Sequence, residues 1–205
     1  MTQVGVIDLE IGNIKAIRSS LRVLGVDSTA VQTPEQIPSF SHLLLPGVGS
    51  FVEPSEKLHE SGWTEALHAS ANRGQPILGI CLGMQLLGLS SSEGGESAGL
   101  GLVNGQTSLL PQSKTARVPH VGWNSVHQRR EHPLYEGIPN HTDFYFSHSF
   151  AMKLTESGEM LGTTEHGEDF ISVVGRGSTL GIQFHPERSQ RAGLRLLLNF
   201  VNWKP

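Results

Sequence analysis

The only cysteine of the chain, Cys81, lies in a pattern that favours nucleophilic chemistry. It occupies the centre of the run Gly79-Ile80-Cys81-Leu82-Gly83, between an apolar segment and an expected helix. The form Gly-x-nucleophile-x-Gly is typical of a strained turn from strand to helix, where side chains two positions away must be minimal. The positive end of the following helix stabilises a thiolate, and the backbone N–H of Leu82 would face a developing oxyanion. A lone cysteine is more often a small buried residue, but the flanking glycines favour a nucleophile.

A candidate base for this thiol, His185, comes much later in the chain. The run from Gly181 to Glu187 alternates apolar and polar residues, which predicts a strand that ends at Pro186. In an extended chain His185 and Glu187 point to the same side, so Glu187 can orient one imidazole nitrogen while the other meets the thiol. A His-x-Glu pair alone is more often a surface pair. Together with Cys81 it indicates a Cys-His-Glu catalytic triad.

A glycine-rich loop follows the apolar run Leu43-Leu44-Leu45. We expect this run to be a strand that Pro46 stops, followed by the loop Gly47-Val48-Gly49. Glycine permits positive φ angles, so such a loop can present backbone N–H groups. The N–H of Val48 would then join that of Leu82 in holding an oxyanion, although Pro and Gly also make ordinary turns.

The remaining histidines and glycines give little support for a metal or nucleotide site. No H-E-x-x-H motif or close pair of ligands occurs, and one cysteine cannot build a cysteine-rich zinc site. The sequence contains no Gly-x-x-x-x-Gly-Lys-Ser/Thr phosphate loop and no Gly-x-Gly-x-x-Gly motif after the first strand. We therefore expect no metal and no cofactor.

Composition limits the classes of partner. The 205 residues carry a net charge of −4 without a long block of like charge, which disfavours nucleic acid and acidic lipid as partners. The apolar stretches are too short to span a membrane, and the N-terminus lacks the regions of a secretory signal. One cysteine excludes an internal disulfide and fits a reducing compartment, so we expect a cytoplasmic protein.

The elements that must position these groups alternate between strands and helices in the first half. We expect strands at residues 4–8, 26–31, 43–45 and 76–80, and helices at 13–24, 51–73, 82–89 and 191–203. This alternation indicates a parallel sheet, and short strands with turns dominate between residues 102 and 184. The expected fold class is α/β, with a mostly parallel central sheet, helices on both faces and antiparallel additions in the second half. We expect one domain, residues 1–205.

Three motifs, in this order and spacing, resemble the class I glutamine amidotransferases. They are Pro46-Gly47-Val48-Gly49, the run from Gly79 to Gln85, and His185-Pro186-Glu187. The resemblance implies the fold of that family, a single glutamine amidotransferase type 1 domain, and a glutaminase whose triad is Cys81, His185 and Glu187. It also implies that glutamine is bound by Gly49, Gly83, Gln85, Glu93, His148, Ser149 and Phe150.

A narrower resemblance covers nearly the whole chain. Asp8 with Gly12-Asn13, and residues 118–124, 144–150 and 187–190, are similar to the glutaminase subunits of imidazole glycerol phosphate synthase, in histidine biosynthesis. This resemblance implies a heterodimer with a (β/α)8 cyclase subunit. The cyclase would use ammonia, delivered through a shielded channel, to make imidazole glycerol phosphate and AICAR from PRFAR. The implied interface residues are Asn13, Trp123, Asn124, Tyr145 and Arg188.

The chain departs from the usual sequence of these subunits at Leu9-Glu10-Ile11, Ser147 and Arg188. The first and last departures lie in segments that would face the partner. Two other functions stay open at this point. A glutaminase could instead feed the pyridoxal phosphate or anthranilate systems, but the run from Val118 to Asn124 argues against this. A catalytically silent binding module with the same fold is disfavoured by the intact triad.

Overall fold

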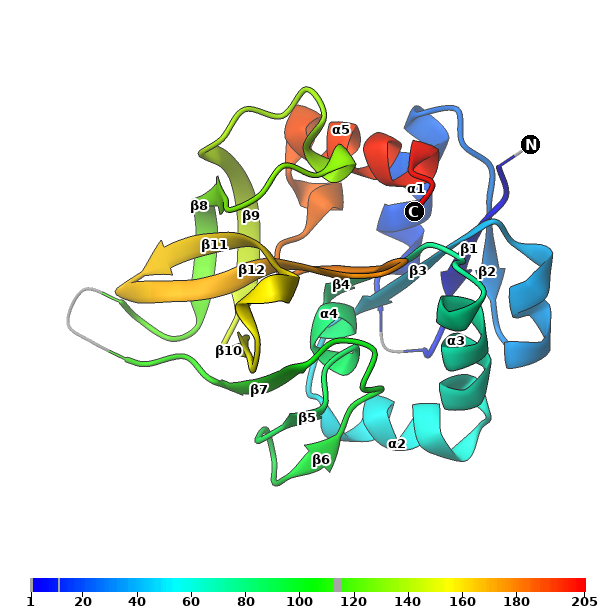
Figure 1. Ribbon diagram of the computed structural model, residues 1–205, viewed down its shortest axis with the longest axis horizontal. Helices are drawn as coiled ribbons and strands as arrows, with labels where there is room; N and C mark the ends of the chain where they lie inside the picture. The colour runs from blue at the N-terminus through cyan, green and yellow to red at the C-terminus, as the bar shows by residue number, and fades with distance from the viewer. Residues whose placement is uncertain (1, 11, 113–115) are drawn as a thin grey trace.

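A central β-sheet with helices on both faces forms the body of the molecule (Figure 1). The structure, a computed structural model, describes residues 2–10, 12–112 and 116–205. The strand order is β2-β1-β3-β4-β13-β12-β10-β7-β5-β6, and β11, β8 and β9 branch from β12. The parallel part consists of β1 (Val4–Ile7), β2 (Ser28–Val31), β3 (His42–Gly47), β4 (Ile77–Cys81) and β13 (Thr179–Ile182).

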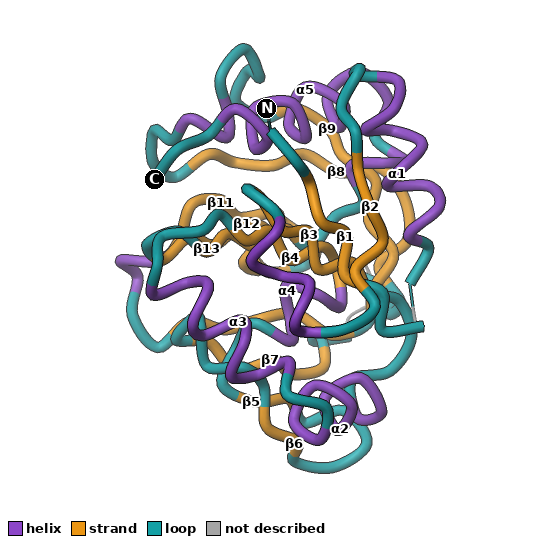
Figure 2. The backbone as a smooth tube through the Cα atoms, turned by 90° about the vertical axis from the view of Figure 1, so that its right-hand side faces the viewer, coloured by secondary structure: helices purple, strands orange, loops and turns teal. Residues whose placement is uncertain are grey.

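The helices separate into two layers, which Figures 1 and 2 show on opposite sides of the sheet. One layer holds α1 (Ile14–Val23) and α5 (Gln190–Asn202). The other holds α2 (Val52–Glu60), α3 (Trp63–Asn72) and the short α4 (Leu82–Leu86). Asn13 caps α1, because its Oδ1 accepts a hydrogen bond from the N–H of Ala16 at 3.2 Å.

Each face of the sheet has its own apolar core, because successive strand residues point to opposite faces. On β3, Leu44 packs in the core under α1 and α5, whereas Leu43 and Leu45 pack in the core under α2, α3 and α4. The same alternation holds on β4, where Ile80 faces the first core and Ile77 the second. Packing on both faces holds β3 and β4 in place, and with them the edge of the sheet at which both strands end.

The second half adds mainly antiparallel strands and short 3-10 turns. The strands are β5 (Ser90–Ser91), β6 (Ser97–Ala98), β7 (Gly105–Leu109), β8 (His120–Gln128), β9 (Thr142–His148), β10 (Phe150–Leu154), β11 (Met160–His166) and β12 (Glu168–Arg176). The 3-10 turns are η1 (Pro34–Ser39), η2 (Pro133–Tyr135), η3 (Ser157–Glu159) and η4 (Pro186–Arg188). The antiparallel pair β8–β9 stands beside η4, so a distant segment of sequence borders the edge where β13 ends.

The expected α/β fold, with a parallel core and antiparallel additions, is confirmed. The C-terminal ends of two strands were wrong by more than one residue, and β2 begins at Ser28 rather than at Val26. β3 continues through Pro46 to Gly47. β1 pairs with β3 only up to Leu44, so the N–H that Pro46 lacks breaks no hydrogen bond to β1. β13 ends at Ile182 rather than at Pro186.

Two expected helices also differ from those observed. The expected helix 51–73 is split by Gly62, whose φ is +75°, and the expected helix 82–89 ends at Leu86. Within the described ranges, no helix combines the length and apolar character needed to cross a membrane.

Candidate active site

Cys81 sits at the sharp turn that the sequence predicted. It is the last residue of β4, and α4 begins at the next residue. Its φ of +56° and ψ of −112° lie in a region that residues with a side chain seldom adopt. A β-carbon at Gly79 would lie 2.6 Å from the Gly83 carbonyl oxygen, and one at Gly83 would lie 1.7 Å from that of Leu45. The expectation that both neighbours of the elbow must lack side chains is confirmed.

His185 and Glu187 meet as expected, but over a turn rather than along a strand. His185 follows the end of β13, and Glu187 lies in η4. His185 Nδ1 and Glu187 Oε1 are 2.9 Å apart, and both side chains are buried. The other carboxylate oxygen of Glu187, Oε2, is buried and has no hydrogen-bond partner among the described residues.

The electrostatic setting of His185 favours its charged form. Burial alone would lower the pKa of His185, but hydrogen bonds and charge interactions with Cys81 and Glu187 outweigh it and raise the pKa to about 10. At neutral pH the ring is therefore an imidazolium that contacts the thiol of Cys81. A neighbouring positive charge stabilises a thiolate, which is the nucleophilic form of cysteine.

Backbone contacts from β9 hold both reactive residues in place. The N–H of His185 donates to the carbonyl of Tyr145 at 2.8 Å. The Oγ of Ser189 accepts from the N–H of Tyr145 and donates to the carbonyl of His185, at 2.9 and 2.6 Å. Cys81 Sγ lies 3.9 Å from the carbonyl oxygen of Ser147. β9 thus links the thiol to its base.

A fourth side chain, Gln183, reaches the thiol and was not among the expected site residues. It is fully buried, and its Nε2 lies 3.7 Å from Cys81 Sγ. Its Oε1 accepts from Gln85 Nε2 at 3.1 Å, and Gln85 Nε2 also donates to the carbonyl of Phe150 at 2.9 Å. The sequence signal was present, since Gln183 is a polar residue between the apolar residues Ile182 and Phe184, both of which are buried.

Cys81 opens into a cavity of about 350 Å³. The expected site residues that line it are Val48, Gly49, Cys81, Leu82, Gln85, Glu93, His148, Ser149, Phe150, His185 and Arg188. Pro119, Val121 and Ser147 also line it and were not expected as site residues. Gly83 instead packs on β3, and Glu187 stands behind His185. The structure thus collects residues from six separate regions of sequence around one thiol.

The two residues whose backbone N–H groups are expected to hold an oxyanion, Val48 and Leu82, both line this cavity. Leu82 is the first residue of α4, where N–H groups are not used by the helix itself. Val48 is exposed in the loop after β3, beside Gly49 with its φ of +99°. Both residues flank the thiol, because β3 and β4 are adjacent and Gly47 pairs with Cys81.

Glu93 gives one wall of the cavity a carboxyl group. Its Oε2 accepts from the N–H of Phe51 at 3.1 Å. Burial raises the pKa of Glu93, against the opposing effect of this hydrogen bond. A partly buried carboxylate of this kind suits a positively charged ligand group such as an α-ammonium.

Exposed apolar and aromatic side chains surround the mouth of the cavity. Trp123 on β8 is 48% exposed, and its ring and that of Tyr145 form a T-shaped pair with 6.1 Å between centroids. The Arg188 guanidinium lies 4.1 Å from the centroid of the Tyr145 ring. Val121 and Val48 are also exposed, and both line the cavity. The resulting surface, with Val48, Val121, Trp123, Tyr145 and Arg188, is here called the mouth face.

The other two expected interface residues have local roles. Asn13 caps α1. Asn124 donates from Nδ2 to the carbonyl of Glu165 at 2.8 Å and to His120 Nε2 at 3.2 Å. Of the departures from the family sequence, Leu9 is buried and Glu10 pairs with Lys57 at 2.6 Å. Ile11 lies outside the described residues.

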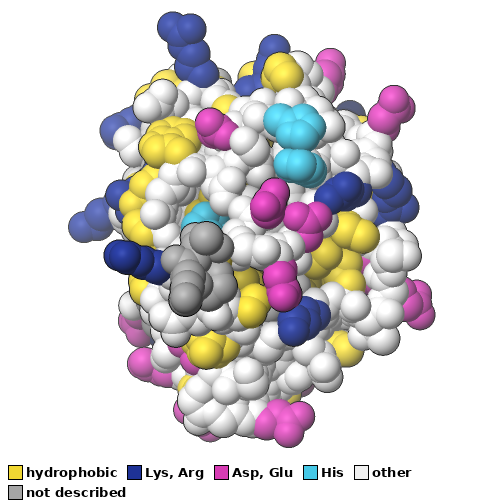
Figure 3. All heavy atoms as spheres, turned by 90° about the vertical axis from the view of Figure 1, so that its left-hand side faces the viewer, with side chains coloured by type: hydrophobic (Ala, Val, Ile, Leu, Met, Phe, Trp, Pro, Cys, Tyr) yellow, Lys and Arg dark blue, Asp and Glu magenta, His cyan; other side chains and the backbone are white. Residues whose placement is uncertain are grey.

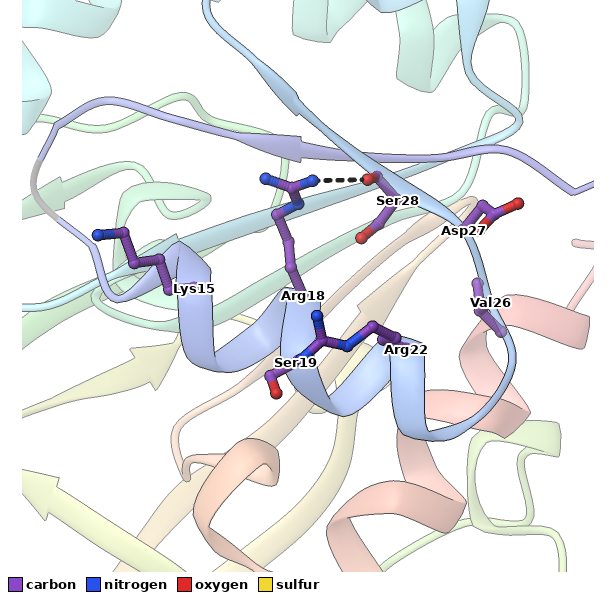
Figure 4. A pocket seen from close by; sticks show the side chains of 7 residues that line it. All are labelled: Lys15, Arg18, Ser19, Arg22, Val26, Asp27 and Ser28. Carbon is purple, nitrogen blue, oxygen red and sulfur yellow. Dashed lines mark hydrogen bonds between the residues drawn. The ribbon is translucent and has the colours of Figure 1, made fainter.

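A second cavity, of about 440 Å³, lies between α1 and β2, and its lining contains no cysteine or histidine. Figure 4 shows Lys15, Arg18 and Arg22 projecting from α1, with Arg18 Nη2 donating to the Ser28 carbonyl at 3.1 Å. Among the described residues, no group of histidine, cysteine and carboxylate side chains is arranged to hold a metal ion. The cavity at Cys81 is therefore the candidate active site.

Comparison with known proteins identifies the family of the chain. The model of the family Glutamine amidotransferase class-I matches residues 5–203. The Imidazole glycerol phosphate synthase subunit HisH of Symbiobacterium thermophilum is 41% identical over 200 residues, covering 98% of this chain and 93% of that protein. The HisH subunit of Moorella thermoacetica is 42% identical, with 98% and 94% covered.

Solved structures share the fold at lower identity. A structure of PurLQS from Thermotoga maritima has a TM-score of 0.77 at 17% identity and covers 98% of each chain. A crystal structure of a glutamine amidotransferase has a TM-score of 0.73 at 22% identity and covers 97% of each chain. At these identities the likeness concerns the fold alone.

Proposed function

Because this chain belongs to the class-I glutamine amidotransferase family, and within it to the HisH subunits of imidazole glycerol phosphate synthase, we propose that Cys81 cleaves the side-chain amide of L-glutamine. The observation that carries the proposal is the strained Cys81 turn beside the buried His185–Glu187 pair. The same membership places the chain in histidine biosynthesis, as the subunit that supplies ammonia.

The thiolate of Cys81 attacks the amide carbon, and the carbonyl electrons move onto oxygen. The backbone N–H groups of Val48 and Leu82 stabilise this oxyanion. His185 gives its proton to the nitrogen, the carbon–nitrogen bond breaks, and ammonia leaves a glutamyl thioester on Cys81. Glu187 keeps the imidazole oriented through Nδ1.

Water then attacks the thioester carbon and passes a proton to His185. Glutamate leaves, and the thiolate–imidazolium pair is restored. Glu93, with its partly buried carboxylate, holds the ammonium group of glutamine, and the backbone at Gly49, His148, Ser149 and Phe150 shapes the rest of the cavity. Gln85 contributes through Oε1, because its Nε2 already donates to Phe150 and Gln183.

Ammonia passes to a partner (β/α)8 cyclase subunit, which forms imidazole glycerol phosphate and AICAR from PRFAR. The mouth face supports this part of the proposal, since exposed Trp123 and Arg188 and the partly exposed Tyr145 beside the cavity are the residue types that anchor protein interfaces. A heterodimer formed there would close the cavity against solvent. We further propose that residues 1–205 act as one glutamine amidotransferase type 1 domain in the cytoplasm, where the Cys81 thiol stays reduced.

The test is glutamate release by the chain alone, with the cyclase subunit, and with the cyclase subunit and its ribulosyl ligand. Wild type is expected to release glutamate in the full complex, and Cys81→Ala is expected to release none while keeping its unfolding curve. Glutamine labelled with 15N at the side-chain amide should deliver the label to imidazole glycerol phosphate. Absence of glutamate from wild type in every condition would reject the proposal.

A further inference from the structure

Two buried histidines outside the triad, His120 on β8 and His148 at the end of β9, form a connected pair. They are 5% and 7% exposed, and His120 Nδ1 lies 3.0 Å from His148 Nε2. Figure 3 views the end of the molecule where these strands lie, and histidine side chains reach the surface there. Only His148 lines the active-site cavity, so His120 has no contact with a ligand in it.

Each hydrogen bond in this chain of contacts has a determined direction. His148 Nδ1 lies 2.8 Å from the Phe150 carbonyl, which can only accept, so this nitrogen carries the proton. In the neutral ring His148 Nε2 then accepts from His120 Nδ1, and His120 Nε2 accepts from Asn124 Nδ2 at 3.2 Å. The Asn124 amide is oriented independently, since its Oδ1 accepts from the Ser125 N–H at 2.8 Å.

Both rings are neutral at physiological pH, which preserves this direction. Burial lowers the pKa of His148 to about 3 and that of His120 to about 4. The charged or titratable groups that face the pair act the same way: His166 stacks on His120 with 4.1 Å between centroids, and His185 faces His148. Phe146 and Phe170 pack on the remaining sides.

The contacts continue from this pair to the thiol. The Phe150 carbonyl, which accepts from His148, also accepts from Gln85 Nε2 at 2.9 Å. Gln85 Nε2 donates in turn to Gln183 Oε1, and Gln183 Nε2 lies 3.7 Å from Cys81 Sγ. A line of polar groups thus runs from Asn124, behind the mouth face, to the nucleophile.

We propose that His120 and His148 are positioning residues: as a neutral pair of fixed tautomers they hold the Phe150 carbonyl, and with it Gln85 and Gln183, so that a Gln183 N–H points at the Cys81 thiolate. The inference rests on the proposed function for its link to glutamine, but not for the chemistry of the thiol. An N–H donor stabilises the thiolate and keeps it aimed at the cavity. Loss of the pair frees the Gln85 amide to rotate.

The first test is direct observation of the tautomers by long-range 1H–15N NMR on the wild-type chain. We expect both His120 and His148 to show a proton on Nδ1 and an unprotonated Nε2 between pH 6 and 8. An imidazolium or an Nε2-protonated ring at either position in that range overturns the proposal. This measurement needs neither a variant nor the partner.

The second test uses the fact that the chain has one cysteine, so alkylation by iodoacetamide reports on Cys81 alone. His120→Leu, which cannot donate, is expected to slow alkylation and glutamate release roughly tenfold, the scale of one unsatisfied buried polar group. His120→Asn places an N–H where Nδ1 was and is expected to restore most of both rates. His127→Leu, on the same strand but outside the pair, serves as the matched control and should behave as wild type.

Unchanged alkylation in a folded His120→Leu chain, or equal loss in His120→Leu and His120→Asn, would overturn the positioning role. A chain that shows the expected tautomers and alkylation rates but never releases glutamate supports the positioning role and rejects the proposed function instead. The two proposals therefore fail separately.

Discussion

Gly83 packs against Leu45 so closely that a β-carbon at position 83 would lie 1.7 Å from the Leu45 carbonyl oxygen. This contact fixes α4 on β3. The loop that carries Val48 leaves β3 shortly after Leu45, and Leu82 lies beside Gly83. The distance between the N–H groups of Val48 and Leu82, which we propose hold the oxyanion, therefore depends on Gly83, even if Gly83 itself does not contact the substrate.

Gly83→Ala is expected to destabilise the chain by about 3 kcal/mol, because the backbone on either side must move to admit the methyl group. Gly158→Ala is the matched control, since a β-carbon there meets nothing within 4 Å, and it should change stability by less than about 0.5 kcal/mol. Urea unfolding measures both. Equal stability of the two variants would contradict the close contact between α4 and β3.

Because the backbone at Cys81 is strained, we expect glycine at this position to give a more stable chain than alanine. With a φ of +56°, Cys81→Gly should be more stable than Cys81→Ala by about 1 kcal/mol, because relief of strain exceeds the entropy that glycine adds to the unfolded chain. Both variants should be inactive. At Ala69, inside α3, replacement by glycine should be destabilising. Thermal unfolding of these variants would reveal whether glycine is more stabilising than alanine at position 81, the reverse of the order expected in a helix.

The raised pKa of His185 predicts the pH dependence of catalysis. The value of about 10 lies above the ordinary 6.5, so the imidazolium is fully present at neutral pH and is lost as pH rises through 10. In the complex, kcat/KM should show no step near 6.5 and should fall near pH 10. Glu187→Gln should move this fall toward neutral pH, since one of the interactions that raise the pKa is lost, whereas exposed Glu168→Gln should leave it unchanged. A step in kcat/KM near pH 6.5 in wild type would argue against a charged His185 paired with Cys81 and Glu187.

Trp123 should contribute more to partner binding than an equally exposed apolar residue elsewhere. Trp123→Ala is expected to weaken binding of the cyclase subunit by about 2 kcal/mol, roughly thirtyfold in Kd, with little change in the stability of the free chain. Leu109→Ala is the control, since Leu109 is 57% exposed on β7, outside the mouth face. Calorimetric titration distinguishes them, and similar Kd values for the two variants would place the interface elsewhere.

Sequence patterns identified those parts of the site that depend on local geometry. The Cys81 turn could be predicted because its glycines are close to it in sequence, and helix α1 because its apolar residues recur every three or four positions. The parallel core followed from the alternation of strands and helices. In each case the determining contacts lie within a few residues or one repeating unit.

Features that depend on contacts between distant segments could not be predicted in this way. The Gln183 contact with Cys81 requires knowledge that β4 and β13 are neighbours. The His120–His148 pair depends on the register of β8 against β9, and no pattern in either strand specifies it. The ends of β3 and β13 were missed for the same reason, because the pairing of neighbouring strands decides where each one stops.

β9 carries two kinds of information in one short segment. Its backbone holds His185 through Tyr145 and approaches Cys81 at Ser147, while the side chain of Tyr145 belongs to the mouth face. Backbone contacts tolerate a change of side chain, but inserting or deleting one residue would turn every side chain of a strand to its other face. The length of β9 is therefore constrained, and so are its buried side chains Phe144, Phe146 and His148. Positions on the other face of the strand, such as Tyr145, can change, so a new partner can be acquired by substitution there without rebuilding the chemistry behind it.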